Sequence, residues 1–418
     1  MSAATTRRDE IISYISFLWP SSLASLLRSL YYPYVIDLAQ QFGALVIEPE
    51  HRFYGESQPL GAYDTQRLQL LTPQQALADA ATLIVAAQRA RNCSAADTIA
   101  TGAPRCPVTT FGGSYPGFLS AMMRIRYPAV VDFAYSASAP VLFYAQQVDQ
   151  AAYYALVSAS AEQASAGCST AVSSMLAQTI GAPDFAKQDA IAQLGLCAPL
   201  PPYIDAGDAA LLRDELAMIV QYSFANLNMA NYPPPNTTLQ AACTAIQTAV
   251  AAAQPWRALS QFLGAYSVAA LGSVRRHQYR GVRAAAAPAF SSLSSSSSSS
   301  CYNLSAQLPA GPAATISSGD WSGVGAGSDG ANWDLETCTF LVETIGTNGQ
   351  TDMFLPRNWT IEWLTQHCAA RFGVAPQPRL LADLWCVAIC CWHAFILRVF
   401  GRVEYLLLSV VVFSISSS

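Results

Sequence analysis

The chain has 418 residues, of which 52% are hydrophobic and 12% are charged, and its formal net charge is −5. A chain of this length and apolar content can bury a large core, and we expect it to divide into two structural units. It carries no basic patch, which excludes recognition of nucleic acid through its phosphates.

The segment 1–33 lacks the uninterrupted apolar core that a secretory signal peptide needs, because charged residues and Pro20 break it. The sequence therefore predicts no signal peptide here. The same segment contains no glycine, which matters below for a glycine-rich loop.

Two helices are predicted in the first quarter of the chain. The segment 34–42 has apolar residues at helical spacing. The segment 72–90 is predicted to be a second helix, because Thr72 can cap it, Pro73 fits its first turn and Gln75 can complete a capping box.

Short apolar runs at 43–47, 108–111 and 130–134 are predicted to be strands. A third helix is predicted over 118–126 and ends before Pro128. The resulting β-α-β-α-β order predicts an α/β fold, with a parallel sheet that helices cover on both faces.

The residues 112–117, GGSYPG, must turn sharply from the second predicted strand into the third predicted helix. Such a turn is a nucleophile elbow, which exposes the hydroxyl of Ser114. The backbone N–H of Tyr115, at the positive end of the new helix, is then a donor for an oxyanion. The sequence departs from the pattern G-x-S-x-G, because Pro116 stands at the second glycine and Gly117 follows it.

A charged loop, EHRFYGES, follows the first predicted strand. Functional loops of an open α/β sheet lie at the carboxyl ends of its strands. Glu50, Arg52 and Glu56 are therefore predicted to form an ion-pair network that shapes a substrate pocket, with a solvated loop as the alternative. His51 is predicted to be a structural or pocket-lining residue.

Four segments, EHRFYGES, FGGSYPGFLSA, WDLETC and IGTNGQTDMF, together resemble the prolylcarboxypeptidase family of serine peptidases. This family has lysosomal Pro-X carboxypeptidase, dipeptidyl peptidase II and thymus-specific branches, and GGSYPG is most similar to the thymus-specific branch. The resemblance extends from about Tyr34 to about Trp385. It implies an α/β-hydrolase fold with a mostly helical cap domain, apparently incomplete at both ends.

The resemblance also implies a serine exopeptidase that forms an acyl-enzyme on Ser114, with the N–H of Tyr115 in the oxyanion hole. Its substrates would be short peptides, cleaved after proline or a small residue near one terminus. A carboxypeptidase and a dipeptidyl peptidase both remain open, as does a homodimer. No metal or organic cofactor is implied.

The chain divides by resemblance and composition into five segments. They are the N-terminal part of the hydrolase core (34–142), a helical cap (143–283), a low-complexity insert expected to be disordered (284–300), the end of the cap with the return to the core (301–384), and a divergent apolar tail (385–418). Charged residues interrupt the tail, so a membrane-spanning segment is not expected.

The cysteine count favours an oxidising compartment. The chain has 11 cysteines, scattered without the paired spacing of a zinc site. N-glycosylation sequons begin at Asn92, Asn236, Asn303 and Asn358. These features favour the secretory route, and the resemblance implies a lysosomal, vacuolar or extracellular location. Buried free thiols with chance sequons are the alternative. In the predicted cap, disulfides are expected among Cys168, Cys197 and Cys243.

The catalytic base is not found by sequence. In an α/β-hydrolase an acid and then a histidine follow the serine, and the family carries both in a C-terminal portion that has no counterpart here. Of the four histidines, His51 precedes Ser114, His277 is predicted to be solvated, His367 to lie partly buried on a helix face, and His393 has no motif around it.

The family's glycine-rich oxyanion segment is also absent from residues 1–33. Absence at both ends is explained most simply by an incomplete or misassembled reading frame. A catalytically dead member that binds peptides or partners is the main alternative function, and an esterase on the same fold is another.

Overall fold

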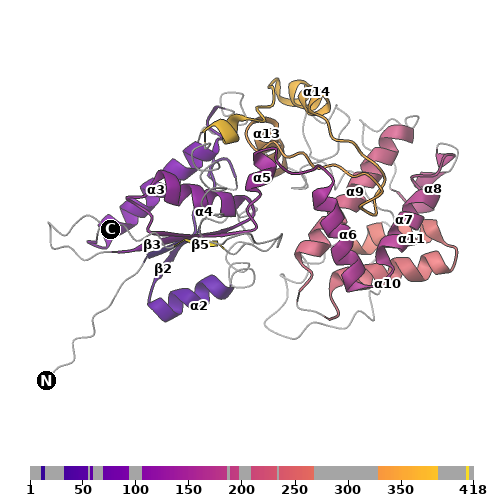
Figure 1. The fold of residues 1–418 in the computed structure, drawn as a ribbon, viewed down its shortest axis with the longest axis horizontal. Coiled ribbons are helices and arrows are strands. Elements are labelled where there is room, and N and C mark those ends of the chain that lie inside the picture. The colour runs from indigo at the N-terminus through magenta and orange to yellow at the C-terminus, as the bar shows by residue number, and fades with distance from the viewer. Residues whose placement is uncertain are drawn as a thin grey trace. The chain divides into compact units, whose positions relative to one another are not determined.

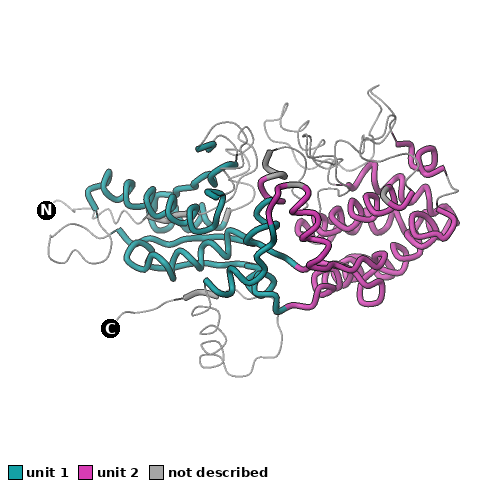
Figure 2. The backbone as a smooth tube through the Cα atoms, turned by 90° about the horizontal axis from the view of Figure 1, so that it is seen from above, with its two compact units in different colours: residues 1–147, 335–343, 375–418 teal, residues 148–334, 344–374 magenta. Residues whose placement is uncertain are grey.

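A computed structural model describes residues 11–14, 33–54, 57–59, 69–93, 106–185, 189–196, 209–232, 235–267, 328–384 and 411–413. The chain forms two compact units, which Figure 2 colours separately. The sheet unit comprises Met1–Gln147, Leu335–Glu343 and Ala375–Ser418, and the helical unit comprises Val148–Asp334 and Thr344–Val374. The predicted five-part division of the chain stays a prediction.

The sheet unit contains a small, mainly parallel sheet. Its strands are β1 (Ile11–Tyr14), β2 (Leu45–Ile47), β3 (Val108–Gly113), β4 (Phe133–Ala137) and β5 (Val411–Phe413). Their order in the sheet is β2-β1-β3-β4-β5, in which the first four are parallel and β5 is antiparallel to β4. The predicted parallel sheet is therefore confirmed for the strands around β3.

Helices cover both faces of this sheet. In Figure 1, α2 (Pro33–Phe42) lies on one face, and α3 (Pro73–Ala90) and α4 (Tyr115–Arg126) lie on the other. Adjacent residues of β3 point to opposite faces, as a strand requires. Phe111 packs against Val35 and Ala39 of α2, whereas the hydroxyl of Thr110 lies 2.9 Å from the hydroxyl of Ser120 in α4.

Local signals explain where α3 begins. The side chain of Thr72 accepts a hydrogen bond from the N–H of Gln75 at 3.2 Å, and Pro73 is the first helical residue. The expected cap and first-turn proline are thus confirmed. A short helix, α5 (Val141–Tyr144), follows β4 in the same unit.

One predicted strand is displaced, and two strands were not predicted. The third predicted strand, 130–134, is displaced, because β4 begins at Phe133. The carboxylate of Asp132 accepts the N–H of Val108 at 2.8 Å, and Val131 is completely buried before the strand starts. Burial in a turn therefore explains the apolar residues there. The strands β1 and β5 were not predicted, and β1 lies between β2 and β3.

The helical unit is built around one apolar core. Its helices are α6 (Ala152–Ala164), α7 (Cys168–Gln178), α8 (Ala190–Leu194), α9 (Ala209–Met229), α10 (Thr238–Ala251), α11 (Pro255–Tyr266) and α14 (Ile361–Phe372). The rings of Phe224 and Phe262 stack at 4.8 Å in this core, and Phe354 contacts Phe224 edge-on. A further helix, α13 (Ser328–Thr339), contributes its first residues to the helical unit and the rest to the sheet unit.

Disulfides are present in both units. Cys93 pairs with Cys106 in the sheet unit, and Cys168 pairs with Cys243 in the helical unit. Cys338 and Cys368 are disulfide-bonded as well. The predicted disulfide partners Cys168 and Cys243 are confirmed, and Cys197 lies outside the described residues.

The low-complexity insert 284–300 lies outside the described residues, and of the tail 385–418 only β5 is described. No described helix is both long and apolar enough to cross a membrane.

Candidate active site

Ser114 occupies a sharp turn between a strand and a helix. β3 ends at Gly113, α4 begins at Tyr115, and Ser114 between them has φ 60° and ψ −131°. Its side chain is exposed. A positive φ is uncommon for a residue with a side chain, and a strained turn of this kind presents the nucleophile of α/β-hydrolases. The predicted elbow geometry is confirmed.

Close backbone contacts explain the glycines of the elbow. A β-carbon on Gly112 would lie 2.0 Å from the carbonyl oxygen of Pro116, and one on Gly117 would lie 2.7 Å from that of Ala137. The N–H of Ser114 donates to the same Ala137 carbonyl at 3.0 Å. Pro116 fits the first turn of α4, where a helix needs no N–H donor. Gly117 therefore allows the close backbone approach to Ala137. In the pattern G-x-S-x-G, the glycine stands one position earlier, where this chain has Pro116.

Tyr115 contributes both its backbone and its side chain. Tyr115 is the first residue of α4, so its N–H lies at the positive end of the helix. No carbonyl within the helix can accept this N–H, because no helical turn precedes it. Its side chain is buried, and the hydroxyl donates to Oε1 of Glu336 at 3.3 Å. The ring also stacks on Phe118 at 6.2 Å.

A buried group of side chains, the Glu336 cluster, comprises Glu336, Tyr54, Tyr115 and His51. The hydroxyl of Tyr54 donates to Oε2 of Glu336 at 2.5 Å. Nε2 of His51 lies 3.9 Å from Oε1, which is too long for a hydrogen bond. The His51 ring packs edge-on against Tyr54 at 5.1 Å. Because Glu336 is completely buried, these contacts replace water around its carboxyl.

Burial sets the charges in the Glu336 cluster. It raises the pKa of Glu336 to about 8, although the bonds from Tyr54 and Tyr115 act in the opposite direction. Burial also lowers the pKa of His51 to about 3, and it raises the pKa of Tyr115 well above its usual value. The cluster is therefore largely uncharged at neutral pH. Nδ1 of His51 lies 2.8 Å from the carbonyl oxygen of Arg52 and so carries the ring proton.

The model of the serine carboxypeptidase S28 family matches residues 24–382 of the chain. The chain belongs to this serine-type peptidase family. Membership implies the α/β-hydrolase fold, in agreement with the elbow and the mainly parallel sheet.

Named relatives match different shares of the chain. Human lysosomal Pro-X carboxypeptidase is 28% identical over 354 residues, which cover 84% of this chain and 61% of that protein. The mouse protein of the same name is 29% identical, with shares of 84% and 62%. Mouse thymus-specific serine protease is 38% identical over 130 residues, 31% of this chain and 23% of that protein. The chain thus spans about three fifths of the length of the Pro-X carboxypeptidases that it matches.

In this S28 chain, side chains of the EHRFYGES loop form the hydrogen bonds and the ion pair that hold the loop. The guanidinium of Arg52 binds both carboxylate oxygens of Asp79 in α3, at 2.6 and 2.7 Å, and also the carbonyl of Leu70 at 3.1 Å. Oε2 of Glu50 accepts the N–H of Ser57 at 2.7 Å. These contacts anchor and close the loop, and any contact with substrate stays a prediction. Glu56 lies outside the described residues.

The helical unit contains a buried acid–histidine pair. Nε2 of His367 lies 2.9 Å and 3.1 Å from the two carboxylate oxygens of Asp334. The ring of Trp363 stacks on His367 at 5.4 Å, and Arg357 lies over Trp363 at 5.3 Å. His367 was predicted to be partly buried on a helix face; it lies in α14 and is only 5% exposed.

This pair does not have the geometry of a catalytic dyad. In a serine protease triad Nδ1 of the histidine bonds the acid, and Nε2 serves the serine. In His367 it is Nε2 that bonds Asp334. The remaining candidates for the base, His277 and His393, lie outside the described residues.

Tyr54 and Glu336 were not predicted as residues of the site. Both lie within quoted segments, EHRFYGES and WDLETC. The available signal was Glu336 itself, which stands among the mostly apolar or uncharged residues of WDLETC. A carboxyl group that is buried needs hydrogen-bond partners, so it indicates a polar cluster.

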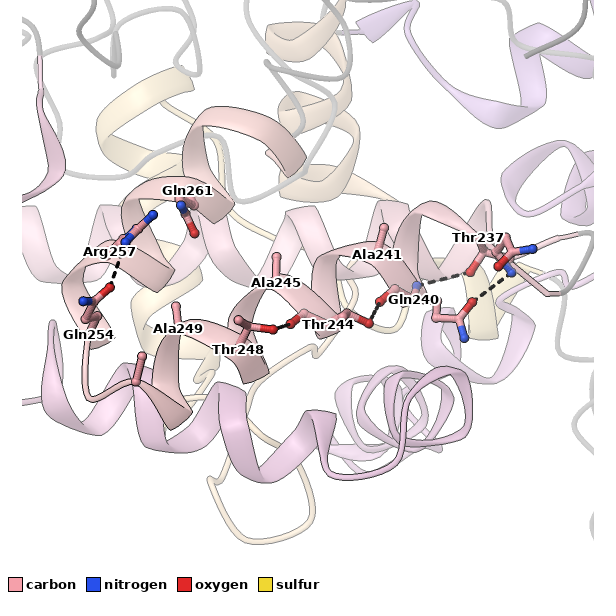
Figure 3. A pocket seen from close by; sticks show the side chains of 12 residues that line it. Thr237, Gln240, Ala241, Thr244, Ala245, Thr248, Ala249, Gln254, Arg257 and Gln261 are labelled. Carbon is pink, nitrogen blue, oxygen red and sulfur yellow. Dashed lines mark hydrogen bonds between the residues drawn. The ribbon is translucent and has the colours of Figure 1, made fainter. Parts of the chain in front are cut away.

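A surface pocket of about 730 Å³ lies in the helical unit along α10 and α11 (Figure 3). Its polar lining is mostly threonine and glutamine. The hydroxyls of Thr244 and Thr248 donate to backbone carbonyls of their own helix at 2.9 and 2.8 Å, and Arg257 donates to Gln254 at 3.0 Å. The residues that line the pocket include no serine, cysteine or histidine, so it presents no constellation for acyl transfer.

Proposed function

We propose that this chain is a serine-type exopeptidase that cleaves short peptides after proline or a small residue near one terminus. The observation that carries the proposal is the exposed Ser114 with φ 60° between β3 and α4. Membership of the S28 family supports a peptidase rather than an esterase. The name of the matched Pro-X carboxypeptidases supports proline as the residue before the scissile bond.

In the proposed mechanism, Oγ of Ser114 attacks the peptide carbonyl carbon while a base takes its proton. The N–H of Tyr115 holds the oxyanion of the tetrahedral intermediate. The base then returns the proton to the leaving nitrogen as the C–N bond breaks, and the acyl group stays on Ser114. Water attacks this ester and releases the product acid. No described histidine is assigned as the base.

Cleavage at the carboxyl end is favoured, because relatives that match 84% of the chain are named carboxypeptidases. Matches to lysosomal Pro-X carboxypeptidases cover 84% of the chain, whereas the match to mouse thymus-specific serine protease covers 31%. The predicted similarity to the thymus-specific branch therefore rests on a partial match that includes less of the chain.

The lysosome or another compartment of the secretory route is the proposed location. The matched carboxypeptidases are named lysosomal, and the disulfides Cys93–Cys106 and Cys168–Cys243 suit an oxidising route.

A catalytically dead member that binds peptides is the second candidate. It is favoured by the state of the two histidines that the structure describes. Burial lowers the pKa of His51 to about 3, which makes its imidazole a weak base, and Nε2 of His367 lies 2.9 Å from the carboxylate of Asp334.

Peptide hydrolysis by the full chain separates these candidates. The substrates are an amino-blocked peptide with proline before its last residue, a carboxyl-blocked peptide with proline second, and a short-chain ester. We expect the first to be hydrolysed, and S114A to abolish turnover. The matched control is S138A, since Ser138 is another exposed serine with positive φ (48°), and it should retain turnover. Binding of the first peptide without hydrolysis would instead establish the binder.

A further inference from the structure

The carboxyl group of Glu336 bonds two segments that are distant in sequence. Oε2 accepts from Tyr54 in the EHRFYGES loop at 2.5 Å, and Oε1 accepts from Tyr115 at the start of α4 at 3.3 Å. All three residues belong to the sheet unit. One carboxyl group therefore sets the spacing between this loop and the nucleophile elbow.

The loop end of this connection is itself fixed. Arg52 binds both carboxylate oxygens of Asp79 in α3. The N–H of Phe53 donates to the carbonyl of Ser57 at 2.7 Å and closes the turn that holds Tyr54. Tyr54 is 4% exposed, so its hydroxyl has little freedom to leave Glu336. The loop is thus a rigid support rather than a mobile flap at this point.

The elbow end of the connection lies next to the proposed chemistry. The backbone of Tyr115 carries the proposed oxyanion donor, and its Cα is shared with the side chain that Glu336 holds. Donors act at about 2.7–3.1 Å from the oxyanion, and a misplacement of about 1 Å in an active site can lower the rate about 100-fold. Small shifts of the Tyr115 side chain are therefore expected to reach the donor.

We infer that Glu336 is a positioning residue for the oxyanion donor, acting through the side chain of Tyr115. This inference rests on the proposed function of Ser114 and Tyr115. Glu336 does not touch the reacting atoms in this account. A glutamine at 336 keeps the shape and one acceptor oxygen, whereas an alanine removes both hydrogen bonds and leaves two buried hydroxyls to find other partners.

The test compares the rate constant for fluorophosphonate modification of Ser114 in the full chain and in E336A, E336Q and Y115F. We expect the rate constant to fall about tenfold or more in E336A. Complete loss of an oxyanion donor lowers the rate about 100-fold to 1,000-fold, and E336A displaces the donor without removing it. E336Q should restore it to within about threefold, because an amide can still accept from one tyrosine and donate to the other. Y115F removes one hydrogen bond only and should fall between them.

The control is D132N. Asp132 accepts the N–H of Val108 at the opposite end of β3, so this variant weakens the same strand without touching the elbow. It should react at the rate of the original chain. An E336A protein that is folded and reacts at the original rate overturns the inference. Should E336A fail to fold, Y115F decides: a Y115F protein that reacts at the original rate also overturns the inference.

A second measurement separates this inference from the proposed function. The amide chemical shift of Tyr115 is compared in the original chain, E336A and D132N. If the original chain does not react with the probe, the proposed function fails. A Tyr115 amide shift that moves in E336A and not in D132N still supports positioning by Glu336, and an unmoved shift in E336A overturns it.

Discussion

Gly112 lies so close to Pro116 that a β-carbon at position 112 would be 2.0 Å from the carbonyl oxygen of Pro116. The obstacle is backbone rather than a flexible side chain, so the first turn of α4 would have to move away from β3. Ser114 joins these two closely packed elements with φ 60°, and its side chain is exposed.

The first prediction concerns this contact. G112A should lower the free energy of unfolding by about 3 kcal/mol, because overpacking against backbone in a filled site costs about 1–3 kcal/mol or more. G113A is the matched control, since a β-carbon there has its nearest neighbour at 4.0 Å. It should change stability by less than about 1 kcal/mol. Urea unfolding of both variants provides the measurement, and equal losses would contradict the structural explanation.

The second prediction is a pH dependence of stability from Glu336. Its pKa is raised from 4.5 to about 8 on folding, so the folded chain holds this proton more tightly than the unfolded chain. The free energy of unfolding should therefore fall as the pH rises from about 4.5 to about 8, by up to about 1.4 kcal/mol per pH unit. E336Q should lack this contribution.

The measurement is the difference between the unfolding free energies of the original chain and E336Q across this range. His51 and Glu343, whose pKa values are also shifted by burial, are present in both proteins and cancel in the difference. A difference that does not vary with pH would show that Glu336 titrates normally.

The third prediction assigns His367 a structural role. H367A leaves the buried carboxylate of Asp334 without its histidine and should lower the free energy of unfolding by about 3 kcal/mol. Peptide hydrolysis per folded molecule should stay unchanged. Q366A, at the exposed preceding position, is the control for stability. Loss of hydrolysis in a stable H367A protein would instead identify His367 as the base.

The fourth prediction concerns the disulfides. Cys168 and Cys243 are separated by 75 residues, and Cys93 and Cys106 by 13. Because loop-closure entropy grows with loop length, removing the first pair should cost about 4 kcal/mol and removing the second about 3 kcal/mol. Paired Cys→Ser variants, unfolded without reductant, test this order. A larger loss from the shorter loop would mean that native packing dominates the effect.

Local patterns predicted the parts of the fold that local forces determine. The cap at Thr72 and the elbow around Ser114 depend on neighbours a few positions away, and both are found as expected. The strand predicted at 130–134 was displaced because Val131 is buried in a turn, so its apolar character did not report a strand.

The candidate site was predictable only in part. Ser114 and the N–H of Tyr115 follow from the motif, but the importance of Glu336 depends on Tyr54, which is 282 positions away. Neither hydrophobic periodicity nor spacing reports such a contact. The strand β1 was missed as well, and its pairing with β2 and β3 is again long-range.

The most direct test of the account is to identify the residue that a fluorophosphonate modifies in the folded full chain, by mass spectrometry of its peptides. The account predicts a single adduct on Ser114, with none on the exposed Ser138. Modification of another residue, or no adduct on a chain shown to be folded, would contradict the claim that the turn between β3 and α4 presents an activated serine.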